Sequence, residues 1–260
     1  MNKEFDPLID CHYEERVIVF LDILGWKDLV LKSKNDYRQR QSMTIILNAI
    51  RSMGVNIKSG GLGVNGNFEF SQFSDSIVFS SSVNQEAVKM LIFLVSNLTQ
   101  MILNQEFLIR GAITKGELLH KDSIIFGPAL NKACDLESKF CIYPRIMIDP
   151  EQIDFFSNIF NDNAIRLIFD ICVNEDGDQF LDILKPHPGK HKGAAFSLEN
   201  AYRVMSKIIE RYNNGINENK MEEKIKIKNN WFIDYYNESV NRYPETQGYD
   251  GKLKKLPHIK

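Results

Sequence analysis

Two aspartates, Asp22 and Asp75, are the residues of this 260-residue chain whose setting could support chemistry. Asp22 directly follows the apolar run Val17–Leu21, whose β-branched and aromatic side chains predict a strand buried on both faces. Asp75 lies in a Ser-Asp-Ser turn between two strand-like runs, Phe68–Phe73 and Ile77–Ser81, and this pattern predicts the tip of a hairpin. If the two strands are neighbours in one sheet, the two carboxylates converge.

Convergent carboxylates repel each other unless a cation lies between them. Mg²⁺ and Mn²⁺ take oxygen ligands and commonly share them with substrate phosphates, so the pair is suited to two divalent ions. After Asp22 the chain reads Ile-Leu-Gly-Trp and enters a predicted helix, whose free amides would favour phosphate oxygens. These features together indicate chemistry on a nucleoside triphosphate. The competing interpretation is that Asp22 is the N-cap of that helix, a position that aspartate favours.

The composition suits one large domain, or one domain with an appendage, around a sizeable core. Hydrophobic residues make up 43% and charged residues 25% of the chain, and the net charge of −2 gives no reason to expect a DNA or RNA partner. No apolar run reaches the length of a membrane span, and the first residues do not resemble a secretory signal, so a cytoplasmic protein is expected. The four cysteines lack metal-type spacing and are expected to be reduced thiols.

Hydrophobic periodicity predicts an α+β fold, with a sheet covered by helices. The expected elements are strands at 17–21, 68–73, 77–81, 108–118, 124–126, 145–148, 166–172 and 179–184, and helices at 28–33, 37–53, 86–103, 128–140, 151–160, 198–212 and 218–243. The last helix carries an aromatic stripe that is expected to pack on the core or on a partner subunit, formed by Trp231, Phe232, Tyr235 and Tyr236. The residues from Pro244 onward are expected to be disordered.

Four stretches in chain order resemble the motifs of class III nucleotidyl cyclases, the family of adenylyl and guanylyl cyclases. Phe20–Trp26 is similar to the first metal-binding motif, and Phe73–Ser76 to the second. Leu108–Gly116 resembles the Arg-x-Gly strand of that family, and Phe126–Glu137 resembles its asparagine-containing helix. The resemblance implies a ferredoxin-like sheet with a helical C-terminal extension. It divides the chain into an N-terminal arm (1–15), a catalytic domain (16–184), a linker (185–195), a helical extension (196–243) and a tail (244–260).

Within this class the chain looks most like the bacterial anti-phage pyrimidine cyclases of the Pycsar system. The similar segments are Ile-Phe-Gly-Pro-Ala-Leu at 125–130, Tyr-Pro-Arg-Ile-Met-Ile-Asp at 143–149 and Asn-Trp-Phe-Ile-Asp-Tyr-Tyr-Asn at 230–237. The resemblance implies a head-to-tail homodimer with shared active sites and UTP or CTP as substrate. The cyclic UMP or cyclic CMP product would act on a separate effector in antiviral defence.

The resemblance also assigns roles to individual residues. It implies that Asp22 and Asp75 hold two divalent ions, Mg²⁺ or Mn²⁺, with the Ile23 carbonyl as a further ligand. It places Asn131 at the ribose in the transition state. The backbone amides offered to the β- and γ-phosphates would be those of Leu24, Gly25 and Trp26.

The sequence departs from the family at four positions. The arginine that binds the transition-state phosphate falls at Asp135, and the lysine of the last hairpin has no counterpart in Asn174–Gln179. The two purine-reading residues fall at Ser71 and Ile124. A site built for one hydrogen-bond pattern rejects bases that lack it, so these changes favour a different base. The residues proposed to replace the missing phosphate ligands are Arg110 and Lys132 first, then Lys115 and Lys27.

Two other interpretations remain open at this point. The missing arginine and lysine also suit a catalytically degenerate, cyclase-like module that binds a nucleotide or a partner protein. A cyclase that uses ATP or GTP is a further possibility, which Ser71 disfavours.

Overall fold

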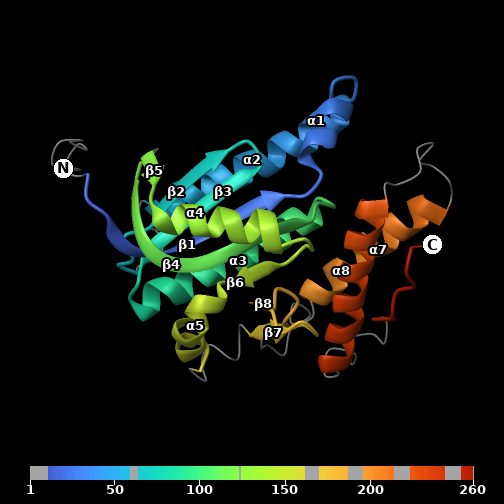
Figure 1. Cartoon of the computed structure of the whole chain (residues 1–260). Coiled ribbons are helices and arrows are strands. Elements are labelled where there is room, and N and C mark those ends of the chain that lie inside the picture. The colour runs from blue at the N-terminus through green and yellow to red at the C-terminus, as the bar shows by residue number, and fades with distance from the viewer. Residues whose placement is uncertain are drawn as a thin grey trace.

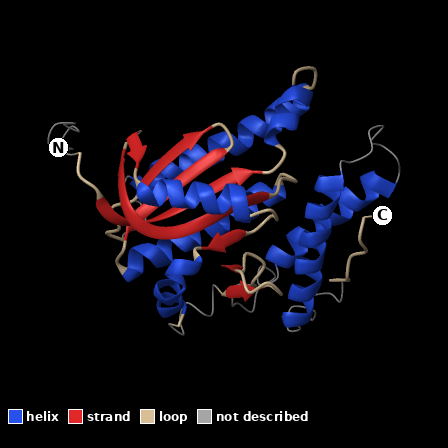
Figure 2. Ribbon diagram, viewed as in Figure 1, coloured by secondary structure: helices blue, strands red, loops and turns tan. Residues whose placement is uncertain are grey.

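The computed structural model describes residues 11–58, 64–122, 124–161, 170–186, 196–213, 223–243 and 253–259. Its centre is an eight-stranded sheet with helices on both faces (Figures 1 and 2). The strands are β1 (Glu14–Ile23), β2 (Glu69–Phe73), β3 (Ser76–Ser82), β4 (Ile109–Lys121), β5 (Ile124–Phe126), β6 (Ile146–Ile148), β7 (Ile171–Val173) and β8 (Gln179–Leu181). The helices are α1 (Trp26–Ser33), α2 (Tyr37–Lys58), α3 (Gln85–Asn104), α4 (Pro128–Asp135), α5 (Ile153–Phe160), α7 (Phe196–Asn213) and α8 (Glu223–Arg242). A π-helical turn, η1 (Leu136–Phe140), extends α4, and a 3₁₀ turn, η2 (Pro150–Gln152), precedes α5.

The sheet order confirms the predicted α+β class and its ferredoxin-like centre. The strands lie in the order β2-β3-β1-β4-β6-β8-β7, with β5 paired to β4. The first part of the chain therefore runs β1, two helices, β2, β3, α3 and β4, and its four strands are antiparallel in the spatial order β4-β1-β3-β2. This is the split βαβ arrangement of ferredoxin-like folds.

β1 lies at the centre of the sheet and is buried on both faces, as its apolar run predicts. Successive side chains of a strand point to opposite faces. Leu21 and Ile23 belong to the main core with α2 and α3, whereas Ile18 and Phe20 pack with α4 on the other face. Asp22 is in phase with Ile18 and Phe20, so its carboxylate is on the α4 side of the sheet. Figure 2 shows α4 in front of the sheet and α2 and α3 behind it.

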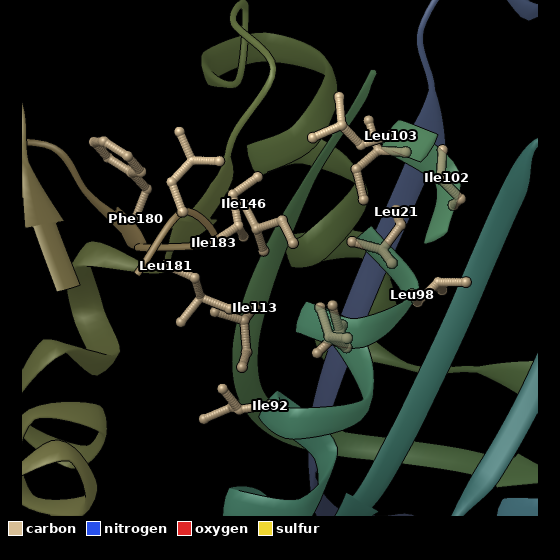
Figure 3. Close-up of a cluster of buried hydrophobic side chains, with 14 of the residues drawn as sticks. Leu21, Ile92, Leu98, Ile102, Leu103, Ile113, Ile146, Phe180, Leu181 and Ile183 are labelled. Atoms are coloured by element: carbon tan, nitrogen blue, oxygen red, sulfur yellow. The ribbon is translucent and has the colours of Figure 1, made fainter. Parts of the chain in front are cut away.

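The main core joins the sheet to α3, as Figure 3 shows. The labelled side chains come from β1, α3, β4, β6 and the segment around β8: Leu21, Ile92, Leu98, Ile102, Leu103, Ile113, Ile146, Phe180, Leu181 and Ile183. By length and hydropathy α3 could cross a membrane, and among the described helices it alone passes that test. More than half of its apolar window is buried inside the protein, between the sheet and α7, so packing in the core accounts for its apolar character.

The predicted C-terminal helices form a layer beside the β7–β8 end of the sheet (Figure 1). The aromatic stripe of α8 was predicted to pack either on the core or on a partner subunit, and it packs on the core. Trp231 and Tyr235 both contact Phe180 of β8, with ring centroids 5.6 and 5.4 Å apart respectively. The residues 244–252 lie outside the description, as do 1–10 of the predicted arm, 187–195 of the predicted linker and 162–169, which include most of a predicted strand.

The end of the chain differs from its prediction. Residues 253–259, expected to be disordered, lie along α8 and bury the side chains of Leu256 and Ile259. Two asparagines of α8 hold this segment, because Asn237 donates to the Leu256 carbonyl at 2.9 Å and Asn230 donates to the Ile259 carbonyl at 3.2 Å. The tail lacks a regular apolar period, so its sequence gave no sign of this extended packing.

Asp182 fixes α8 to the sheet. Its side chain is fully buried and accepts hydrogen bonds from the hydroxyls of Tyr235 and Tyr243, both at 2.6 Å, while the Arg242 guanidinium lies 3.1 Å away. A buried carboxylate is stable only when it is paired and hydrogen-bonded, and here donors from α8 and its end meet it. The C-terminal extension and the sheet therefore share one buried polar contact.

Replacing Asp182 with alanine is expected to destabilise the protein by about 3–5 kcal/mol, because two buried tyrosine hydroxyls and the Arg242 guanidinium lose their acceptor at once. Chemical denaturation of the variant and the wild type measures the difference in the free energy of unfolding. Asp234→Ala is the matched control, since Asp234 is an exposed aspartate of α8 whose 2.6 Å contact, with His258, is also exposed. An equal loss in both variants would contradict the role given to Asp182.

Candidate functional site

The strand register brings the two aspartates together. Asp22, at the end of β1, is paired with Ser76 of β3, and Asp75 precedes Ser76 in the tight turn between β2 and β3. Ser74 takes a positive φ of 55° in this turn, which lets a two-residue connection reverse the chain. The Asp22 and Asp75 carboxyl groups are close enough to share a hydrogen bond. The convergence expected from the sequence is therefore present in the structure.

A third carboxylate, that of Glu137, adds to the negative charge. It comes from η1 at the end of α4, and its side chain is 7% exposed. Burial raises the pKa of Asp22 to about 7, and the charges of Glu137 and Asp75 act in the same direction. Burial also raises the pKa of Glu137 above its usual value. A positive charge placed among these groups would be strongly favoured.

Arg110 supplies part of that charge from the adjacent strand. It lies directly opposite Asp22 in the β1–β4 pair, and its Nε is 3.5 Å from Asp22 and 2.5 Å from Glu137. The guanidinium lowers the pKa of Asp22, against the larger effect of burial. Arg110, predicted to be a phosphate ligand, thus lies at Asp22, where it already pairs with two carboxylates.

The helix start after β1 offers donors, although not all those expected. Gly25 is the N-cap of α1 with a positive φ of 77°, so Asp22 does not cap this helix. The Leu24 amide donates to the Leu108 carbonyl at 2.9 Å and is not free for a phosphate. The first intrahelical bond runs from the Leu29 amide to the Gly25 carbonyl, which leaves the amides of Trp26 and the next two residues without helical acceptors. Ile23 ends β1, opposite Ile109 of β4.

The α4 residues that were expected to contact the substrate are exposed or pair with residues other than Asp22 and Asp75. Asn131 is exposed on α4. Lys132 pairs with Glu151 at 2.7 Å and approaches Asp149 at 3.8 Å. Asp135, where the family has an arginine, pairs with Lys139 one turn further along, at 2.9 Å. Among the other cations proposed as phosphate ligands, Lys115 pairs with Glu15, and Lys27 is exposed on α1.

Ser71, in β2, lines a hollow between the β2–β3 hairpin and α4. The other lining residues are Phe20, Lys58, Phe70, Gln72, Phe73, Ser76, Val78, Asp122, Ile125, Leu130 and Cys134. Ile124 is next to this hollow in sequence but is not part of its lining, and its side chain is 41% exposed. The Ser71 hydroxyl is 3.0 Å from Nε2 of His120, a buried residue of β4.

The donor set at the aspartates suits divalent ions that share their coordination with a substrate. The described residues contain no group of three or more His, Cys, Asp or Glu side chains arranged to hold a metal by themselves. Mg²⁺ is commonly bound by one or two carboxylates plus substrate phosphates, and it does not need an all-protein cage. Asp22 and Asp75 provide such a pair, whereas Glu137 is engaged by Arg110.

Comparisons with known proteins give structural likeness without sequence likeness. No protein-family model and no curated protein matches the chain. The solved structures similar to it include the catalytic core of a rhodopsin-guanylyl cyclase with converted specificity in complex with ATPαS, with 16% identity, a TM-score of 0.42 and coverage of 65% of this chain and 94% of that one. The guanylyl cyclase domain of the RhoGC fusion protein of the aquatic fungus Blastocladiella emersonii is 17% identical, with a TM-score of 0.42. That match covers 65% of this chain and 95% of the fungal domain. A bacterial light-regulated adenylyl cyclase is 13% identical, with a TM-score of 0.43, and the match covers 77% of this chain and 60% of that one.

These neighbours are guanylyl and adenylyl cyclase structures, but TM-scores of 0.42 and 0.43 do not assign a family. The chemistry of the site therefore has to be argued from this chain's own residues.

The sequence did not single out three residues of the site. Glu137 ends the stretch that resembles the asparagine-containing helix, so its position in that motif was the available signal. His120 gave none, because a lone histidine in an apolar strand reads as a core residue. Lys228 of α8 interacts electrostatically with Asp22 and Glu137, although it is distant from both in sequence.

His120 makes the stability of this region sensitive to acid. Burial, followed by the charges of Arg16 and Lys58, lowers its pKa from 6.5 to about 3. Below pH 6.5 His120 is therefore protonated in the unfolded chain but stays neutral in the folded protein. Its contribution lowers the free energy of unfolding by up to about 1.4 kcal/mol for each pH unit of acidification between pH 6.5 and 3.

We expect His120→Gln to flatten this pH dependence, as measured by chemical denaturation at pH 7, 6, 5 and 4. His12→Gln, at an exposed histidine, is the control and should retain the wild-type slope. Parallel curves for His120→Gln and the wild type would show that His120 is not the acid-sensitive group.

Proposed function

We propose that this protein is a metal-dependent nucleotide cyclase that converts UTP or CTP to the 3′,5′-cyclic monophosphate and pyrophosphate. The observation that carries this proposal is the contact between the Asp22 and Asp75 carboxyl groups at the end of the central strand, next to the free amides at the start of α1. Carboxylates that hold cations and amides that donate hydrogen bonds to phosphate oxygens are the two parts that a triphosphate site needs.

In the proposed mechanism, Asp22 and Asp75, with the Ile23 carbonyl, would hold two divalent ions, Mg²⁺ or Mn²⁺. Ions bound there supply positive charge to the triphosphate and increase the acidity of the attacking hydroxyl. The ribose 3′-oxygen gives its proton to solvent water and forms a bond to the α-phosphorus, while the bond from that phosphorus to the oxygen shared with the β-phosphate breaks and pyrophosphate leaves with that oxygen. The Trp26 amide and its neighbours orient the leaving phosphates, and the Asn131 side chain steadies the ribose.

Ser71 and Ile124 support the choice of a pyrimidine. A hydroxyl and an aliphatic side chain take the place of the charged or polar groups that would read a purine. The Ser71 hydroxyl is directed to His120 and can also donate to the Asp122 carbonyl at 3.4 Å, so it is already part of a local network. A site with these groups lacks the hydrogen-bond pattern that would favour adenine or guanine.

A head-to-tail homodimer is part of the proposal, because Asn131 and Ser71 have contacts separate from those of the aspartates. Pairing two copies would bring these residues of one protomer to the carboxylates of the other. Exposed apolar side chains near the hairpin and β5 support such an interface: Phe73, Ile124 and Phe126 are 84%, 41% and 45% exposed. The cyclic product would act on a separate effector in defence against phage.

The decisive measurement is incubation of the purified protein with each of the four ribonucleoside triphosphates and Mn²⁺, followed by identification of the products. We expect a cyclic pyrimidine monophosphate and pyrophosphate in equal amounts. Asp22→Asn and Asp75→Asn should each lower the rate by at least about 10³-fold, because each removes a carboxylate proposed to hold the ions.

The same two variants should retain the fold, since removing one of several crowded carboxylates relieves repulsion. Thermal unfolding checks this expectation. Asp154→Asn, an isosteric change at an exposed aspartate of α5, is the activity control. Wild-type activity in either site variant would rule out the proposed role of the carboxylate pair.

A second candidate, a cyclase-like module without catalysis, is favoured by one specific observation. Arg110, Lys115 and Lys132 each pair with a carboxylate, so three of the four cations predicted to replace the family's phosphate ligands are already neutralised. Nucleotide binding without release of pyrophosphate from any of the four triphosphates would identify this alternative. Cyclic AMP or cyclic GMP as product would instead support a purine cyclase.

A further inference from the structure

The first half of α8 is held beside the carboxylate cluster by aromatic stacking. The Trp231 indole stacks on the Tyr143 ring with a centroid separation of 5.3 Å and an interplanar angle of 9°. The Arg145 guanidinium lies 5.7 Å from the centroids of both of these rings. Tyr143 and Arg145 belong to the segment that follows η1, the turn that carries Glu137. This contact therefore places the N-terminal part of α8 close to the site.

Lys228 lies three residues before Trp231, and residues at this spacing share a face of a helix. Its ammonium interacts electrostatically with Arg110, Asp22, Glu137 and Cys141, which come from β4, β1, η1 and the residue after η1. The side chain is half-buried. Burial, followed by the positive charge of Arg110, lowers the pKa of Lys228, whereas the carboxylates oppose this shift.

Lys228 differs from the other cations around the site in its pairing. Arg110 and Lys132 make ion pairs of 2.5 and 2.7 Å with glutamates, and Lys226 of the same helix lies 4.0 Å from Glu223. Within the described part of the chain, the Lys228 ammonium has no carboxylate oxygen within 4.0 Å. It is a half-buried positive charge that interacts with Asp22 and Glu137 and retains its hydrogen-bond donors.

From these contacts we infer that Lys228 is a phosphate-binding residue, which the C-terminal extension contributes to the nucleotide site of the same chain. The inference rests on the proposed function and deepens it. An ammonium can donate three hydrogen bonds, and a triphosphate beside Asp22 would bring phosphate oxygens to the group that lacks a partner. The β7–β8 connection provides no lysine in Asn174–Gln179, so α8 takes over this part of the site.

The test compares nucleotide affinities with calorimetry in the presence of Mn²⁺. The probes are 3′-deoxy-UTP and 3′-deoxy-CTP, which lack the attacking hydroxyl and cannot be cyclised, and the corresponding 5′-monophosphates. We expect Lys228→Met to weaken triphosphate binding by about ten- to a hundred-fold, the range for loss of a hydrogen bond to a charged group. The affinity for the monophosphates should not change, because the lost contact is to the terminal phosphates.

Lys226→Met is the matched control, since it removes a lysine of the same helix that pairs with Glu223, and its affinities should equal those of the wild type. Lys228→Arg should restore part of the triphosphate affinity, because it retains the positive charge. Thermal unfolding of each variant verifies that α8 remains docked. Methionine retains the unbranched apolar stem of the lysine, so the Lys228→Met fold should be preserved.

Equal or tighter triphosphate binding by Lys228→Met would overturn the inference, as would an equal loss of triphosphate and monophosphate affinity. If the wild type still forms a cyclic nucleotide in that case, the proposed function stands without this residue. A wild-type protein that neither binds nor cyclises any of the four triphosphates would overturn both the proposed function and the role of Lys228.

Discussion

Negative charge is crowded at the end of the central strand, and the arrangement of the site around it follows from this constraint. Asp22, Asp75 and Glu137 converge from β1, the β2–β3 turn and η1, and Arg110 offsets two of them, Asp22 and Glu137, with ion pairs. A stable protein seldom gathers carboxylates in a partly buried place, because desolvation and mutual repulsion both oppose their ionisation. The fold retains this arrangement at a cost, and bound cations with a polyanionic ligand would remove that cost.

The sheet makes this arrangement possible because its register fixes side chains more precisely than a loop would. Pairing of Asp22 with Ser76 on one side and with Arg110 on the other determines which groups share the α4 face. A shift of one residue in either pairing would turn the partner to the opposite face. The apolar residues of β1 prevent such a shift, since Leu21 and Ile23 belong to the main core while Phe20 packs with α4.

The parts of this site that the sequence predicted are those encoded locally. The strand before Asp22, the turn at Asp75 and the glycine before α1 are each visible within a few residues, and the structure contains all three. The prediction that the Leu24 amide is free to bind phosphate is wrong, because this amide donates to the Leu108 carbonyl, which is near it only in the folded sheet. Lys132 was predicted to bind phosphate because of its place in a motif, but it pairs with Glu151 of the later turn η2. Such pairings depend on tertiary contacts that spacing does not reveal.

The C-terminal extension likewise makes tertiary contacts that the sequence does not reveal. The aromatic stripe of α8 was visible in the sequence, but its partners were not, because Tyr143, Phe180 and Asp182 are 50 or more residues away in the chain. These contacts attach α8 at two places, by stacking near η1 and by the buried Asp182 network near β8. A helix held at both places can keep Lys228 in electrostatic contact with Asp22 and Glu137. The extension is therefore built as part of the site, and its docking and the electrostatic balance of the carboxylates are linked.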